Sequence, residues 1–272
     1  YAETWYNLGN TLAALGDHDA ALAACQAGVA RRPDDFDMLL ALAKAWHRHG
    51  QAAQALGVLS QVLALAPQLA DAWNTLGAMR EQNGEMAAAR DAYRRAVDLA
   101  PGLAAAQLNL GTAELCLGNF PAGWRGYAYR PRQAGVPDPL ACAGRGATPG
   151  ALAGRSVLLY AEQGLGDTLQ FARYAPLLVA AGARVGLLVQ PALKSLLAAS
   201  LPTVSVFSPE DAPPAADEHW PLLSLPLVFS TTLASIPAPV PYLPPRAAAA
   251  RWARRLPPAS DGKPRIGVAW SA

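Results

Sequence analysis

Apolar and small residues recur along the first 130 residues with a period of 34. Each period combines helix-like apolar spacing with a leucine, a glycine and, in the first three units, a proline in constant phase: Leu8, Leu42, Leu76 and Leu110; Gly16, Gly50, Gly84 and Gly118; Pro33, Pro67 and Pro101. This punctuation predicts a helix, a turn at the glycine and a second helix that ends at the proline. We therefore expect about four helical hairpins over residues 1–130.

Small residues occupy two further phases of the repeat, where paired helices must approach each other closely: Gly9, Ala43, Gly77 and Gly111; Ala21, Ala55, Ala89 and Gly123. Large residues such as Trp5 and Trp73 stand one turn earlier and are expected to fill the helix interface. The W-x-x-L-G runs that begin at Trp5 and Trp73 resemble the tetratricopeptide repeat. This resemblance implies a helical solenoid whose concave groove binds a protein or peptide partner.

One phase of the repeat bears on that groove. In the O-linked N-acetylglucosamine transferases, whose architecture this chain resembles, the groove carries a ladder of asparagines. The corresponding phase here reads Asn7, Ala41, Thr75 and Asn109. Asn7 and Asn109 are therefore candidate partner-binding residues, and ordinary polarity of a helix surface is the alternative explanation for them.

The fourth repeat changes character after Gly118. Gly123, Trp124, Tyr127 and Tyr129 stand where the other units have small and aliphatic residues, and the terminal proline is missing. Because a stacked repeat cannot bury its own apolar face, we expect this unit to be a cap that docks on the next domain.

A different pattern follows a Pro-, Gly- and Ala-rich linker at residues 131–155. Apolar strand-like runs at 156–160, 183–189 and 203–207 alternate with helical patterns at 168–181 and 191–199. Such alternation predicts βαβ units and a parallel sheet. The predicted fold is thus α + α/β, with a helical solenoid over residues 1–130 and a Rossmann-like half over residues 156–260.

The segment from Gln163 to Asp167 lies between the first predicted strand and its helix. Ligands of open α/β sheets bind beyond the carboxyl ends of the strands, where helix amides attract anions and glycines allow close approach. However, Asp167 falls at or near the helix N-cap, a position that aspartate prefers for purely structural reasons. Spacing alone leaves a functional and a capping role equally open, and the two are compatible.

Several blocks in this part are similar to bacterial tetratricopeptide-containing glycosyltransferases related to the heptosyltransferases, which have the two-lobed GT-B fold. The blocks are LLYAEQGLGDTLQFARYAPLL at 158–178, PLLSLP at 221–226 and VPYL at 240–243. The resemblance implies transfer of a sugar from a nucleotide-diphosphate sugar to a hydroxyl of a glycan or protein acceptor, without a cofactor. It also implies that Asp167 is the general base, flanked by substrate-binding Gly164, Gly166 and Thr168.

Other candidate substrate-binding residues are less specific. Gln163 and Gln170 are expected to line the same cleft, whereas Phe171 and Tyr174 share the helix face of Asp167 but are expected in the core. Asp217, His219 and Ser224 lie around a further strand end, although a lone histidine beside Trp220 is more often structural.

Two expectations concern how the modules are joined and completed. The helix-like stretch 246–256 and the strand-like run 265–270 resemble the crossover and the opening strand of a second lobe, which would begin at residues 261–272 and hold the donor. The fragment itself is therefore expected to be inactive. Tyr129-Arg130-Pro131-Arg132 departs from the aromatic-rich segment of the relatives, so looser docking between modules is expected.

A non-catalytic interaction scaffold is the alternative to the function of sugar transfer.

Composition narrows the class of protein further. The formal charge of +2 comes without a clustered basic stripe, which argues against nucleic-acid binding. Three cysteines, Cys25, Cys116 and Cys142, show no disulfide or metal spacing and favour a reducing, cytoplasmic setting. The four histidines lack the spacing of metal ligands, and no apolar run is long enough to predict a membrane span.

Overall fold

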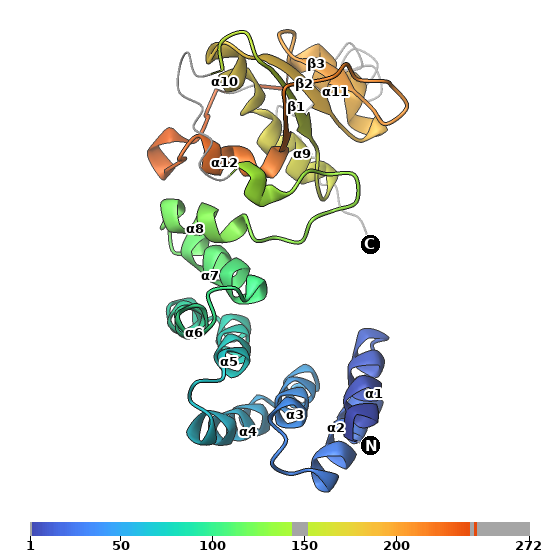
Figure 1. The fold of residues 1–272 in the computed structure, drawn as a ribbon, viewed down its shortest axis with the longest axis vertical. Coiled ribbons are helices and arrows are strands. Elements are labelled where there is room, and N and C mark those ends of the chain that lie inside the picture. Colours follow the sequence, from blue (N-terminus) through green and yellow to red (C-terminus); the bar gives the residue numbers. More distant parts are fainter. Residues whose placement is uncertain (1, 143–151, 240–241, 244–272) are drawn as a thin grey trace, which may run out of the picture.

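A computed structural model describes residues 2–142, 152–239 and 242–243. The chain forms an array of paired helices followed by a smaller α/β module that lies at the end of the array (Figure 1). The expected second-lobe elements at 246–256 and 265–270 lie outside the described residues, as does part of the linker at 143–151.

The repeat pattern correctly predicts four helical hairpins. The pairs are α1 Ala2–Ala14 with α2 His18–Arg31, α3 Phe36–Arg48 with α4 Ala52–Leu65, α5 Ala70–Gln82 with α6 Met86–Leu99, and α7 Ala104–Cys116 with α8 Phe120–Tyr127. The phased glycines Gly16, Gly50, Gly84 and Gly118 all adopt a left-handed backbone with φ between 81° and 84°. Glycine is the residue best suited to this conformation, so each one ends a first helix and begins the turn.

The small residues of the repeat lie where the helices of a pair touch. Ala43, Ala55 and Ala89 are fully buried. At Gly77 an added Cβ would lie 2.5 Å from the ring of Tyr93, and at Gly111 it would lie 2.5 Å from the backbone of Gly126. Because Gly77 and Gly111 have no side chains, the two helices of each pair can approach this closely.

The α/β module contains a four-stranded parallel sheet in the order β3-β2-β1-β4. Its elements are β1 Ser156–Tyr160, α9 Leu165–Ala172, α10 Ala175–Ala180, β2 Arg184–Leu188, α11 Pro191–Ser200, β3 Ser205–Phe207, β4 Glu218–Pro221 and α12 Leu225–Val228, with short 3-10 turns η1 Pro139–Cys142, η2 Leu222–Ser224 and η3 Leu233–Ser235. Ser156 pairs with Arg184 of β2, and Val157 pairs with Glu218 of β4.

The predicted strands are confirmed, but the predicted helix over residues 168–181 is wrong in one respect. The structure divides it into α9 and α10, with a break at Arg173 and Tyr174. Pro176 lies in the first turn of α10. Because proline has no backbone N–H and clashes with the preceding turn, it starts a new helix here and does not continue α9.

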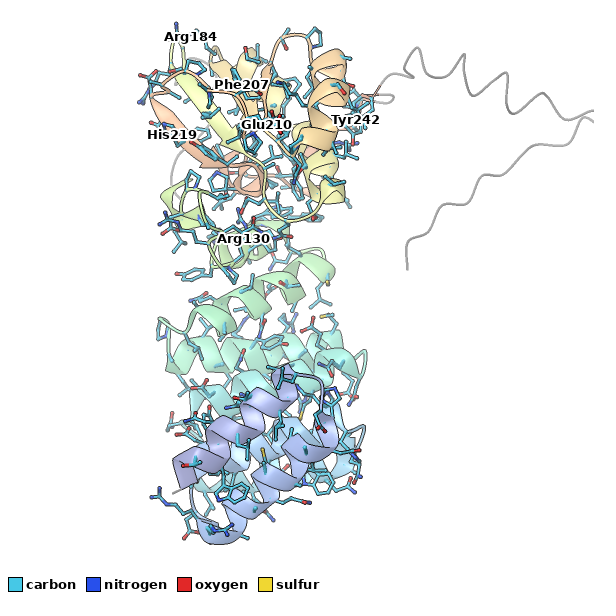
Figure 2. The ribbon with its side chains drawn as sticks, turned by 90° about the vertical axis from the view of Figure 1, so that its right-hand side faces the viewer. Arg130, Arg184, Phe207, Glu210, His219 and Tyr242 are labelled. Carbon is cyan, nitrogen blue, oxygen red and sulfur yellow. The ribbon has the colours of Figure 1, made fainter. Side chains whose placement is uncertain are left out.

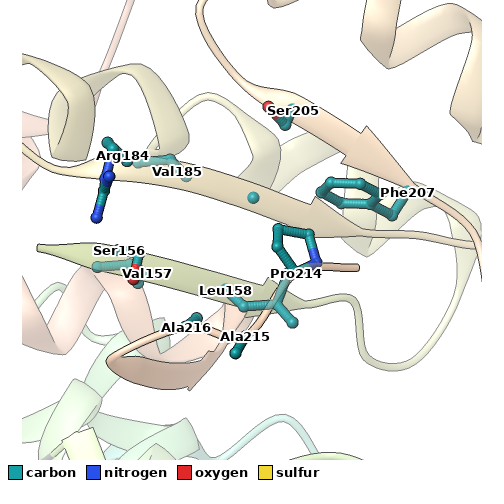
Figure 3. Close-up of a pocket in the computed structure, with 11 residues that line it drawn as sticks. Ser156, Val157, Leu158, Arg184, Val185, Ser205, Phe207, Pro214, Ala215 and Ala216 are labelled. Carbon is teal, nitrogen blue, oxygen red and sulfur yellow. The ribbon is translucent and has the colours of Figure 1, made fainter. Parts of the chain in front are cut away.

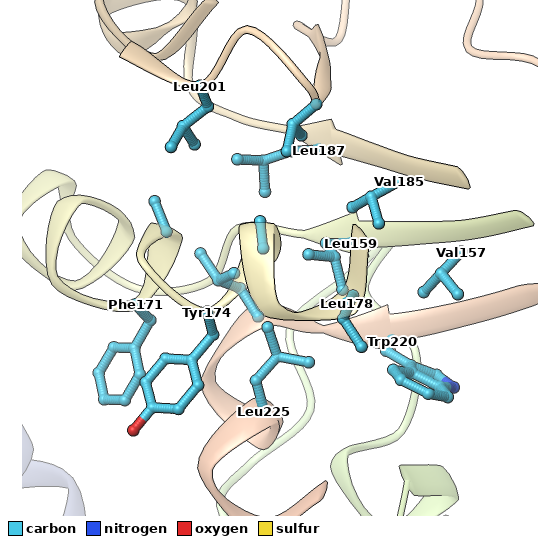
Figure 4. Packing of buried hydrophobic residues seen from close by; sticks show 14 of the residues in the cluster. Val157, Leu159, Phe171, Tyr174, Leu178, Val185, Leu187, Leu201, Trp220 and Leu225 are labelled. Atoms are coloured by element: carbon cyan, nitrogen blue, oxygen red, sulfur yellow. The ribbon is translucent and has the colours of Figure 1, made fainter. Parts of the chain in front are cut away.

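The two faces of the sheet are covered differently. Val157, Leu159, Val185 and Leu187 point into one apolar core that α9, α10, α11 and α12 complete (Figure 4). On the opposite face, Leu158, Gly186 and Phe207 line a pocket of about 320 Å³ together with the segment Pro214–Ala216 (Figure 3). The connection from β3 to β4 therefore contributes a loop, and not a helix, to this second face.

The last repeat docks on the α/β module as predicted for a cap. Trp124 of α8 packs edge-on against Phe171 of α9, with ring centroids 6.3 Å apart, and Tyr127 packs against the same core. The expectation that Tyr129–Arg132 loosens this docking is wrong, because Arg130 is buried in an ion pair with Glu162 at the junction. Figure 2 shows Arg130 between the two modules.

Candidate functional site

The strand order identifies one end of the sheet as the place for a ligand. From β1 the chain proceeds to β2 and β3 on one side, and β4 then returns to the other side of β1. In open parallel sheets, ligands bind beyond the carboxyl ends of the strands at such a reversal. Here that position holds the β1–α9 loop, residues 161–164, and the start of α9. A pocket of about 390 Å³ lies at the carboxyl ends of β1 and β2, lined in part by Tyr160, Leu188 and Gln190.

Asp167 lies in the first turn of α9 and accepts a hydrogen bond there. Its Oδ2 accepts from the N–H of Gly164, the residue before the helix, at 3.0 Å. The side chain is half-buried. A carboxylate in the first turn stabilises the helix by satisfying a free amide and by its interaction with the helix dipole. Asp167 thus has the capping role in α9 that its position predicted. Its Oδ1 makes no hydrogen bond with the described residues.

Other predicted residues of this loop differ in accessibility. Gln163, Gly164, Gly166 and Gln170 are exposed. Thr168 is fully buried and donates to Gln190 Oε1 at 3.0 Å, so it supports the loop from beneath and does not face a substrate. Gly164 and Gly166 have ordinary backbone angles, and an added Cβ at Gly166 would meet no atom within 4 Å. The fold itself therefore does not require glycine at either position.

Gln163 adopts the left-handed conformation with φ of 57°, which few residues other than glycine adopt. This conformation costs about 1 to 2 kcal/mol for a residue with a side chain. Strained positions of this kind concentrate at functional sites and persist only where neighbouring contacts hold them. The β1–α9 loop is thus held in a specific shape by its surroundings.

Ser224 lies behind the loop, in a buried polar cluster that the sequence did not predict. Its Oγ accepts from Arg130 Nη2 at 2.8 Å, and the same guanidinium forms a two-pronged contact with Glu162. One feature of the sequence could have indicated this cluster: Glu162 is a charged residue that lies two positions after the apolar strand β1. Ser224 is therefore part of the module junction and not of an open cleft.

The structure does not bring Asp217 to the β1–α9 loop, and His219 reaches only Tyr160, the residue that precedes this loop. Asp217 lies at the amino end of β4, where the Ser156 N–H and hydroxyl donate to its Oδ2 at 2.7 Å and lower the pKa of its carboxyl. Ser156 and Tyr160 are four residues apart, so this end is about 13 Å from the loop end. His219 Nδ1 lies 2.7 Å from the Tyr160 hydroxyl, whose pKa burial raises. The structure therefore places Asp217 at the amino end of β1, away from the cleft that was predicted for it.

A second candidate site lies on the repeat array. A pocket of about 180 Å³ is formed by the first helices of three successive hairpins, with these lining residues: Tyr6 and Asn10 of α1; Asp37, Leu40, Ala41 and Lys44 of α3; and Asp71 of α5. Asn7 and Asn109 do not line it. Asn109 Nδ2 instead donates to Asn74 Oδ1 at 3.0 Å, which joins two repeats, and Asn7 is exposed.

Neither a metal-binding cluster nor a membrane-spanning helix is present in the described part of the chain. No group of three or more histidine, cysteine, aspartate or glutamate side chains there is arranged to hold a metal ion. None of the helices over residues 2–142, 152–239 and 242–243 is both long and apolar enough to cross a bilayer.

Comparison with known proteins identifies the class of the helical part. Residues 2–35 and 48–104 each match a family model described as tetratricopeptide repeat. Together with the four helical hairpins and their phased glycines, these matches identify the helical array as tetratricopeptide repeats. The matches lie within the repeat array and do not extend to the sheet.

Among curated proteins, the chain is similar to Protein FlbA of Caulobacter vibrioides, with 28% identity over 216 residues. The match covers 64% of this chain and 36% of FlbA, so the chain spans about a third of that relative. Among solved structures, a tetratricopeptide protein of Thermus thermophilus, TTC0263, is 22% identical, with a TM-score of 0.43 over 52% of this chain and 74% of that one. The first tetratricopeptide domain of RPAP3, solved with an HSP90 peptide, is 23% identical, with a TM-score of 0.38 over 43% and 92%.

Proposed function

We propose that the repeat array binds an extended segment of a partner protein along the face formed by α1, α3 and α5. One observation carries this proposal: a single pocket is shared by the first helices of three consecutive hairpins. A ligand that fills it touches three repeats at once, as an extended chain does when it lies across stacked helices.

The chemistry of the pocket suits a polar peptide. Leu40 and Ala41 form a buried apolar floor, while Asn10, Asp37 and Lys44 are exposed around it. Among the described residues, the side chains of Asp37, Lys44 and Asp71 have no ion-pair or hydrogen-bonding partner. These groups are therefore available to the backbone and charged side chains of a partner, and a hydrogen bond to a charged group contributes about 1.5 to 3 kcal/mol.

The test is a selection of peptides from a random library on the immobilised protein, followed by calorimetric titration of the selected peptides. We expect Lys44→Ala and Asp71→Ala each to weaken binding roughly 10- to 100-fold, the equivalent of losing one such contact. Gln61→Ala is the control, because Gln61 is an exposed residue of α4 outside the pocket. The proposal is contradicted if the selected peptides bind Lys44→Ala and Asp71→Ala as tightly as the wild-type protein. Failure to select any peptide also argues against it.

Sugar transfer in the α/β module is a second candidate function, in line with the resemblance of residues 158–178 to glycosyltransferases. The observation that favours it is the parallel order β3-β2-β1-β4, with an exposed, glycine-containing loop at the reversal. In this scheme the module is the acceptor-binding Rossmann-like lobe. Asp167 takes the proton of an acceptor hydroxyl as that oxygen bonds to the anomeric carbon and the nucleoside diphosphate leaves.

The experiment for this second function uses the product of the complete gene, supplied with a panel of nucleotide-diphosphate sugars and analysed by mass spectrometry. Asp167→Asn is expected to lower turnover by about 100-fold or more, because general base catalysis contributes 10²- to 10⁴-fold, and to change Tm only slightly, because asparagine keeps an acceptor for the Gly164 N–H. Asp98→Asn, which alters an exposed carboxylate on α6, is expected to leave turnover unchanged. Turnover that Asp167→Asn leaves intact limits Asp167 to its capping role, and absence of turnover with every donor leaves the binding function alone.

A further inference from the structure

We infer that Tyr127, the last residue of α8, and Gln133, which lies beyond it, together with Arg130 between them, are positioning residues for the β1–α9 loop. They hold Glu162 and Gln163 in place, so the shape of this loop depends on the repeat array. The inference goes beyond the binding of a partner in the groove, and it does not depend on which ligand the loop takes.

Arg130 fixes Glu162, the second residue of the β1–α9 loop. Its Nε and Nη2 donate to the two oxygens of Glu162 at 3.0 and 2.8 Å, and both side chains are almost completely buried. Glu162 Oε1 also accepts from the Leu223 N–H at 3.1 Å. Because paired contacts of arginine with carboxylate are geometrically strict, the backbone at Glu162 has little freedom.

Tyr127 and Gln133 hold the next residue. The N–H of Gln163 donates to Gln133 Oε1 at 3.3 Å, and its Nε2 donates to the Tyr127 hydroxyl at 3.1 Å. Tyr127 ends α8, the last helix of the array, and Gln133 lies in the segment that joins the array to the sheet. A residue with a side chain stays in the left-handed region only when its surroundings hold it there. These two hydrogen bonds therefore hold Gln163 in its left-handed conformation.

The α/β module supplies fewer constraints on the same residue. Gln190 Nε2 donates to the carbonyl of Gln163 at 3.3 Å, and further along the loop the Asp167 carboxylate accepts from Gly164. The side chains of Gln163 and Leu165 are exposed, so burial does little to order the loop. The contacts from Tyr127, Arg130 and Gln133 consequently provide much of the order.

A coupling of this kind acts in both directions. A ligand that binds the β1–α9 loop in its observed shape strengthens the contact with the array by the same factor by which the array favours binding of that ligand. The repeat array is therefore part of any site at the carboxyl end of the sheet.

The experiment is hydrogen exchange of the backbone amides, measured by mass spectrometry on the whole chain. Tyr127→Phe combined with Gln133→Ala removes only the two partners of Gln163. We expect exchange over residues 163–168 to become roughly fivefold faster or more, as the loss of about one net hydrogen bond allows. Exchange in β1 and Tm are expected to stay unchanged, which separates this local effect from a general loss of stability.

Two controls keep the test decisive. Tyr129→Phe alters a neighbouring tyrosine whose hydroxyl has no partner among the described residues, and it should leave the loop unchanged. Gln163→Gly accepts the left-handed backbone without strain, so Tyr127→Phe should have little further effect in that background. The inference is overturned if the loop exchanges at the wild-type rate in the double variant, or if Tyr127→Phe has the same effect with and without Gln163→Gly.

Discussion

Replacement of Arg130 with methionine is expected to lower the free energy of unfolding by about 3 to 5 kcal/mol. Arg130 and Glu162 are 3% and 2% exposed at their side chains, and the guanidinium is the only cationic partner of that carboxylate within the described residues. Without it, Glu162 keeps only the amide of Leu223 among its partners in the described ranges, and it remains as an uncompensated charge in a low-dielectric junction. Urea unfolding followed by circular dichroism measures the loss.

A second variant separates the charge from the packing. Arg130→Met combined with Glu162→Leu removes both charges, and it is expected to recover more than half of the loss, because apolar replacements of buried ion pairs are often neutral or stabilising. A matched surface change, Arg125→Met, should alter stability by less than about 0.5 kcal/mol, since Arg125 is exposed on α8 and its side chain has no hydrogen bond or ion pair among the described residues. A loss below about 1 kcal/mol in Arg130→Met alone would contradict the structure of the junction.

The second large effect is expected at Gly111, where α7 and α8 are in backbone contact. A Cβ at this position would lie 2.5 Å from the carbonyl carbon of Gly126 and 2.6 Å from the backbone nitrogen of Tyr127. Neither atom can move unless the two helices separate. Gly111→Ala is therefore expected to lower the free energy of unfolding by about 3 kcal/mol, at the upper end of typical overpacking costs and despite the better helix propensity of alanine.

Gly57 in α4 provides the matched control for Gly111. It is an exposed helical glycine whose added Cβ would meet nothing within 4 Å. Gly57→Ala should stabilise the chain by about 0.5 to 1 kcal/mol, because alanine loses less backbone entropy on folding. Effects of the same sign and size in the two variants would show that helix propensity, and not the close approach of α7 and α8, determines the outcome at Gly111.

Local and periodic features of the fold were predictable from the sequence. The 34-residue period predicts the helix pairs, because each glycine in phase with Gly16 must provide a left-handed turn and each small residue a close contact. The apolar runs at 156–160 and 203–207 predict strands, because short runs of apolar and β-branched residues between turns favour the extended conformation. The break before Pro176 was also accessible in principle, since proline rarely continues a helix.

Contacts between distant residues were not predictable in the same way. Arg130 and Glu162 are 32 positions apart, and no period links them. Arg130 looked like a departure from an aromatic segment, although its charge is what joins the modules. Asp217 was associated with a strand end, but an apolar pattern does not say which end of a strand lies beside a loop. The candidate site was therefore predicted as a segment, Gln163 to Asp167, and not as a set of contacts.

The tight junction has a geometric consequence for a long partner. Because α8 packs directly on α9 and Arg130 is buried in an ion pair with Glu162, these contacts restrict the orientation of the array relative to the sheet. If a partner binds along α1, α3 and α5 as proposed, the distance from that pocket to the β1–α9 loop is then determined by the number of repeats between them. Insertion or loss of one 34-residue unit would change this distance without altering either site.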